Sequence, residues 1–133
     1  MDCIYSSRFS QNLFSMLNFL KGFVYAFNGL VIFFRHERNG RIQMAVAILV
    51  VLLSWWLKIA APEWIVVLGC IGAVLSLEMI NSSIEKICNL VHPKYHPAVK
   101  TIKDMSAGAV LFVSIVSAII GAIIFLPKIY PLL

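Results

Sequence analysis

Charged residues are scarce in this sequence. Lys, Arg, Asp and Glu together make up 13% of the 133 residues, whereas apolar residues make up 61%. Soluble domains average about 25% charged residues, so this composition excludes an ordinary soluble domain and indicates a protein whose natural solvent is a lipid bilayer. The formal net charge of +5 is small and dispersed along the chain. It indicates cytoplasmic loops of a membrane protein rather than a nucleic-acid-binding surface.

Several short motifs are also missing. Cys3, Cys70 and Cys88 have no CxxC spacing, so we expect neither a disulfide nor a cysteine metal site. The first twelve residues lack the apolar core of a signal peptide, and we expect the N-terminus to be retained. The seven glycines form no GxxxxGK[ST] sequence, which excludes a P-loop. With no internal repeat or linker, residues 1–133 are predicted to form a single membrane-embedded domain.

Three apolar runs have the roughly 20 residues needed to cross a bilayer. They are predicted at about residues 42–61, 64–84 and 105–126. Pro62 and Glu63 are expected to form the turn between the first two runs, and Pro127 is expected to end the third. The second run is purely apolar only through Leu77. To cross the membrane, its helix must continue to about Ile84. This extension places Glu78 and Asn81 at the inner edge of the membrane.

The stretch at about residues 8–34 is long enough for a fourth span, but it carries Asn18, Lys21 and Asn28. These polar residues favour an amphipathic helix lying in the interface. Basic residues gather in the connection before the first run, at residues 35–41, and in the connection before the third run, at residues 86–103, which predicts that both connections are cytoplasmic. The expected fold is therefore an all-α membrane protein with three transmembrane helices and an N-terminal amphipathic surface helix.

Polar residues in the second run share one helix face. Glu78, Asn81 and Glu85 stand at i, i+3 and i+7, and the two carboxylates are about 10 Å apart along the axis. A carboxylate inside a membrane costs roughly 2.5 to 3.5 kcal/mol at mid-depth, so it is usually functional. With this separation, one of the two carboxylates can lie at lipid-headgroup depth while the other lies in water. Such an arrangement suits a reaction between a membrane alcohol and a soluble anion.

Two further clusters are expected at the same cytoplasmic boundary. Glu37 precedes the first span, and Lys103 with Asp104 precedes the third. Carboxylates can hold Mg²⁺ and a lysine can neutralise phosphate oxygens, which are the parts that phosphoryl transfer needs. The alternative is a small transporter or assembly subunit in which Glu78 binds a cation or a proton.

The segments LEMINSSIEKICNLV and KTIKDMSAGAVL resemble the prokaryotic diacylglycerol kinase family, which includes the undecaprenol kinases. The residues that match its signature are Glu78, Asn81, Ser82, Ser83, Ile84, Glu85, Lys103, Asp104 and Met105. Upstream, YAFNG and ERNGR match the family pattern at Tyr25, Gly29, Glu37 and Arg41. The resemblance covers roughly residues 20–126. Asn89 and Lys100 depart from it, which leaves the choice of lipid and the nucleotide affinity open.

The resemblance implies an ATP-dependent and Mg²⁺-dependent kinase that phosphorylates undecaprenol or diacylglycerol. It implies a homotrimer in the bacterial inner membrane, with sites between subunits at the cytoplasmic face. Glu78 would be the catalytic base or the residue that orients the lipid hydroxyl, and Glu37 and Glu85 would bind the metal. The nucleotide would be bound by Tyr25, Gly29, Glu37, Asn81, Glu85, Lys103 and Asp104.

Overall fold

The computed structural model describes the backbone of residues 2–130 and the side chains of residues 19–130. Four helices account for this part of the chain. They are α1 (Asp2–His36), α2 (Arg38–Trp56), α3 (Ala61–Val91) and α4 (Pro97–Ile129). The described residues include no strand, which confirms the predicted all-α class. Residues 1–36 and 37–133 form two compact units, and each is described by itself.

The first unit consists of α1. Its 35 residues cover the whole of the expected N-terminal helix at residues 8–34. No proline interrupts it, and it ends at His36, whose Nδ1 atom lies 3.2 Å from the carbonyl oxygen of Ile32. The N-terminal region is thus helical, as expected.

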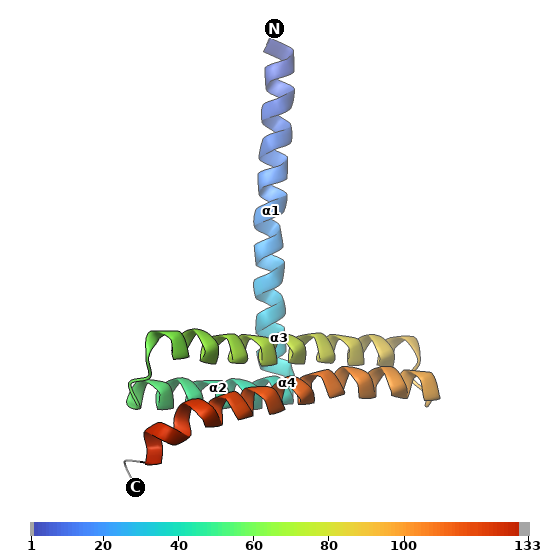
Figure 1. The fold of residues 1–133 in the computed structure, drawn as a ribbon. Helices are drawn as coiled ribbons and strands as arrows, with labels where there is room; N and C mark the ends of the chain where they lie inside the picture. The colour runs from blue at the N-terminus through green and yellow to red at the C-terminus, as the bar shows by residue number, and fades with distance from the viewer. Residues whose placement is uncertain (1, 131–133) are drawn as a thin grey trace. The chain divides into compact units, whose positions relative to one another are not determined.

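The second unit contains α2, α3 and α4. Among the described residues, these are the three helices that are long and apolar enough to cross a membrane. Figure 1 shows α3 and α4 as an antiparallel pair, with α2 beside the N-terminal half of α3. Ile59, Val67 and Phe125 form a small buried core where these helices meet. Most other large apolar side chains are exposed, as expected for helices whose surroundings are lipid or other protein.

The turn between α2 and α3 lies earlier than the sequence predicted. Helix α2 ends at Trp56, and residues 57–60 form the connection because Lys58 has a φ of 49°, in the left-handed region that stops a helix. Pro62 and Glu63 belong instead to the first turn of α3, where a missing N–H is harmless. The carboxylate of Glu63 accepts a 2.6 Å hydrogen bond from the Ala60 N–H. The predicted Pro62–Glu63 turn was therefore wrong.

Helices α3 and α4 both extend beyond the expected spans. Helix α3 continues to Val91 before a five-residue connection, and α4 continues through Pro127 to Ile129. The expectation that Pro127 ends the helix was wrong, since a proline this close to a helix end removes only one backbone hydrogen bond near its terminus. At the same end, Lys128 forms a 3.1 Å ion pair with Glu63, which joins the last turn of α4 to the first turn of α3.

Candidate functional site

The polar face of α3 runs from a buried carboxylate to an exposed one. Glu78 is only 3% exposed, and its Oε1 atom is buried with no hydrogen-bond partner among the described residues. One turn later, Ser82 is also buried. Glu85 has a side chain that is 54% exposed. The two carboxylates are about 10 Å apart along the helix axis, so one face of α3 carries acidic groups in two different environments.

Asn81 is held from the neighbouring helix. The hydroxyl of Ser106 on α4 donates a 2.7 Å hydrogen bond to Asn81 Oδ1, and it lies 3.0 Å from the carbonyl oxygen of Lys103. The sequence analysis missed Ser106. The signal that could have found it is its position three residues after Lys103, which puts both side chains on the same face of α4.

Lys103 reaches across from α4 to the exposed end of the α3 face. Its ammonium group donates a 3.1 Å hydrogen bond to Asn89 Oδ1 and lies 3.4 Å from Glu85 Oε1. Lys103 and Glu85, which the sequence placed in one site, are therefore in contact. Asn89, which appeared only as a departure from the family pattern, contributes to holding this lysine.

Glu37 joins the same end of the helices through a second lysine. It lies at the N-terminal boundary of α2 with an extended backbone, at φ −91° and ψ 121°. Its Oε1 atom is 2.6 Å from the Nζ atom of Lys86 on α3. Lys86 directly follows Glu85 in the sequence, so this ion pair brings Glu37 to the level of the exposed carboxylate. Lys86 was not among the predicted site residues.

Asp104 pairs with a different lysine from those that hold Glu37 and Glu85. Asp104 forms a 2.5 Å ion pair with Lys100, one turn earlier on α4, and both side chains are exposed. Surface pairs of this kind contribute about 0 to 1 kcal/mol to stability, so Asp104 can leave Lys100 for another partner at little cost. Tyr25 and Gly29 lie four residues apart on α1, on one face of that helix. Their place in the site stays a prediction, because α1 belongs to the other unit.

The donor groups suit a metal that arrives with a nucleotide. Among the described residues, no three His, Cys, Asp or Glu side chains gather closely enough to form a complete metal site. Mg²⁺ is typically bound through one or two protein carboxylates, with water and substrate phosphates as the other ligands. Glu37 and Glu85 each offer one such carboxylate, and each is paired with a lysine, Lys86 or Lys103.

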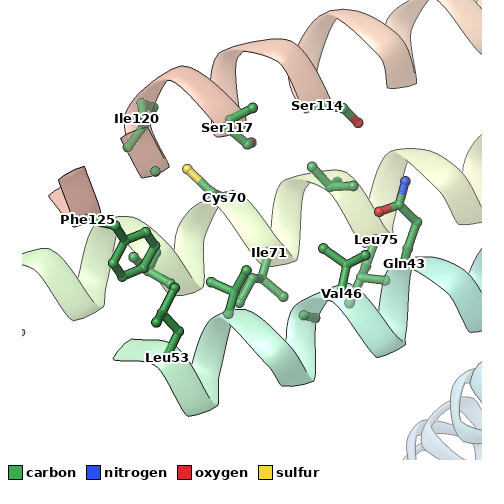
Figure 2. Close-up of a pocket in the computed structure, with 16 residues that line it drawn as sticks. Gln43, Val46, Leu53, Cys70, Ile71, Leu75, Ser114, Ser117, Ile120 and Phe125 are labelled. Atoms are coloured by element: carbon green, nitrogen blue, oxygen red, sulfur yellow. The ribbon is translucent and has the colours of Figure 1, made fainter. Parts of the chain in front are cut away.

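A cavity of about 430 Å³ lies deeper between α2, α3 and α4. Figure 2 shows apolar side chains such as Val46, Ile71 and Phe125 around it. The Ser114 hydroxyl oxygen is buried with no hydrogen-bond partner among the described residues. The lining includes no carboxylate or lysine, so it offers none of the groups that phosphoryl transfer requires. The polar cluster on α3 and α4 is the better candidate for chemistry.

Comparison with known proteins matches the same region of the chain. Residues 24–125 match the family model described as prokaryotic diacylglycerol kinase. An undecaprenol kinase of Bacillus subtilis is 39% identical over 110 residues, covering 83% of this chain and 89% of that protein. A diacylglycerol kinase of Synechocystis is 32% identical over 117 residues, covering 87% of this chain and 67% of that one. The diacylglycerol kinase of Escherichia coli K12 is 26% identical over 115 residues, covering 86% and 94%.

Proposed function

Because the chain belongs to the prokaryotic diacylglycerol kinase family and is a membrane lipid kinase, we propose that it transfers the γ-phosphoryl group of ATP to a lipid hydroxyl. The acceptor is undecaprenol or diacylglycerol, and the reaction depends on Mg²⁺. The observation that carries this proposal is the α3 face, on which a buried Glu78 and an exposed Glu85 are about 10 Å apart. A lipid hydroxyl and a soluble nucleotide can approach such a face from opposite directions.

Glu78 receives the lipid hydroxyl in this proposal. Its unpartnered Oε1 atom can accept a hydrogen bond from the hydroxyl group and then its proton. The position of Glu78, about 10 Å along the helix from the exposed Glu85, supports this role, because a lipid alcohol stays at headgroup depth whereas ATP stays in water. The same carboxylate would aim the lipid oxygen at the γ-phosphorus, so it would act both as a base and as an orienting group.

The exposed half of the face holds the nucleotide. Glu37 and Glu85 supply oxygen ligands to the metal ion, and Lys103 neutralises phosphate oxygens. Asn81 hydrogen-bonds the nucleotide, and Ser106 fixes the orientation of the Asn81 amide. When bound, Mg²⁺ offsets negative charge on the transferred phosphoryl group.

Three further residues complete the proposed nucleotide site. Tyr25 and Gly29 would contact ATP from α1, and Asp104 would position it from the first turns of α4. Their support is the match of YAFNG and KDM to the family pattern. The proposed assembly is a homotrimer with sites between subunits, each chain contributing residues 1–133 as one domain. Cross-linking of the full chain in detergent should then give a limiting species of three copies.

We place the site at the cytoplasmic face of a bacterial inner membrane. Basic residues at positions 35–41 and 86–103 support this orientation. With α1 on the inner surface and three crossings, the chain ends lie on opposite sides. Cysteines introduced as Lys21→Cys and Tyr130→Cys, in a background without the three native cysteines, should react with an impermeant reagent from opposite sides. Labelling from the same side would refute the three-span topology.

The decisive experiment is phosphorylation with labelled ATP, using purified full-length protein in detergent. Undecaprenol and diacylglycerol are offered separately, with Glu78→Gln as the control. We expect phosphate transfer to at least one lipid and almost none with the variant. If the wild type phosphorylates neither lipid but couples a cation or proton gradient to transport, the proposal is wrong and the transporter alternative stands.

A further inference from the structure

Lys86 is the residue for which the structure gives a role that the sequence did not. We propose that Lys86 is a positioning residue that exchanges partners during nucleotide binding. It neutralises Glu37 while the site holds no metal, and it turns to a nucleotide phosphate oxygen once Glu37 becomes a metal ligand. This inference rests on the proposed function, because it takes Glu37 to be a ligand of the nucleotide's metal ion.

The Lys86 and Glu37 side chains are in direct contact. Lys86 Nζ and Glu37 Oε1 are 2.6 Å apart, which joins the C-terminal half of α3 to the start of α2. The first turn of α2 contains no acidic residue. The Glu37 side chain is 25% exposed, whereas that of Lys86 is 58% exposed. The carboxylate is thus partly enclosed, and the lysine approaches it from the solvent side.

The other proposed metal ligand, Glu85, is also paired with a lysine. Glu85 is 3.4 Å from Lys103, just as Glu37 is paired with Lys86. Both proposed metal ligands are therefore paired with an ammonium group. A divalent cation and an ammonium group compete for the same carboxylate oxygens, so metal binding must displace or loosen each lysine.

A displaced Lys86 side chain can move to a new anionic partner. A lysine is a point charge on a flexible four-carbon stem, so it can change partners without moving the backbone. Bound ATP brings several negative oxygens to the carboxylates that its metal ion occupies. The freed ammonium of Lys86 then has an anionic partner close to its original position. Each carboxylate then binds the metal in place of an ammonium group, and each ammonium group binds phosphate in place of a carboxylate.

This exchange predicts effects of opposite sign for one substitution. Lys86→Gln removes the competitor for Glu37, so the protein without nucleotide should bind Mn²⁺ more tightly by about two- to five-fold, the value of a half-exposed ion pair. At saturating Mn²⁺, the same variant should bind a non-hydrolysable ATP analogue about ten-fold more weakly, because one charge-assisted contact to phosphate is lost. A purely structural lysine would shift both affinities in the same direction.

The measurement is titration of the full-length protein in detergent with Mn²⁺ alone, followed by electron paramagnetic resonance of free Mn²⁺, and then with the analogue. Lys94→Gln is the matched control, since it removes one positive charge from the nearby α3–α4 connection. It should leave both affinities within two-fold of wild type. Lys86→Arg tests the idea independently, because a guanidinium holds a carboxylate with two hydrogen bonds. It should weaken Mn²⁺ binding by about two-fold.

Unchanged Mn²⁺ affinity in Lys86→Gln would overturn the proposal, as would a loss of both affinities. If Lys86→Gln does not assemble, an Arg variant that binds Mn²⁺ as tightly as wild type overturns it equally. The lipid phosphorylation assay of the wild type is a separate measurement. Its failure removes the proposed function, whereas an unchanged Mn²⁺ titration in an active enzyme removes only the role of Lys86.

Discussion

Substitution of Glu78 by Gln tests the central claim about the α3 face. Gln keeps the size of the side chain but cannot accept a proton at neutral pH. General-base assistance typically contributes 10² to 10⁴ in rate, so turnover should fall by at least a hundred-fold. Binding of the metal-nucleotide complex should change little, because Glu78 lies about 10 Å from Glu85 along the helix and is only 3% exposed.

The structure also predicts the effect of this substitution on stability. A buried polar group without a hydrogen-bond partner costs about 1 to 3 kcal/mol, and more when it is charged. The Oε1 atom of Glu78 is such a group among the described residues. Glu78→Gln replaces this buried carboxyl group by an amide of the same size, so the variant should unfold at the same temperature as wild type or at a higher one. A residue kept for packing or pairing predicts a lower unfolding temperature.

The assay is phosphate transfer from labelled ATP at saturating lipid and nucleotide, combined with thermal unfolding of the same detergent preparation. Ser83→Ala is a suitable control, since Ser83 is exposed on α3 and its hydroxyl bonds only to the backbone oxygen of Met79 among the described residues. It should retain most of the activity. If Glu78→Gln keeps more than about a tenth of wild-type turnover, Glu78 is not the base. Asp104 would then be the next candidate.

Two other predictions concern contacts at the site, and a third concerns the far end of α3. Glu37→Gln and Glu85→Gln should each weaken metal-nucleotide binding without loss of expression or assembly, and unchanged Mg²⁺ and ATP titrations would remove both as ligands. Ser106→Ala should raise the KM for ATP a few-fold while kcat stays within two-fold, since one hydrogen bond of about 1 kcal/mol to Asn81 is lost; an unchanged KM would contradict this. Glu63→Ala should lower the unfolding temperature at unchanged nucleotide affinity, because the Ala60 N–H and Lys128 lose their partner, and thermal unfolding checks it.

The turn between α2 and α3 illustrates why element boundaries were harder to predict than elements. The pattern Pro62–Glu63 is typical both of a turn and of the first turn of a helix, and the sequence alone did not distinguish them. The left-handed backbone of Lys58, which moved the connection to residues 57–60, has no local sequence signal. Pro127 raised the same difficulty, because a proline near a helix end can lie inside or outside the last turn.

The sequence by itself determined the helical class, the three apolar helices and the common face of Glu78, Asn81 and Glu85. These features depend on composition, on length and on the 3.6-residue period, all of which are local properties of the chain. The separation of Glu78 and Glu85 by about 10 Å along the helix axis followed from the same spacing. The motif order that resembles the kinase family was likewise present in the linear sequence.

Only the tertiary structure decided which side chains meet across helices. The pairs Glu37–Lys86 and Asn81–Ser106 depend on how α2 and α4 are rotated and shifted against α3. That rotation is set by the sum of many small packing contacts, and no single residue specifies it. For this reason the sequence identified the carboxylates of the candidate site, whereas Lys86, which pairs with Glu37, and Ser106, which hydrogen-bonds Asn81, emerged only from the packed helices.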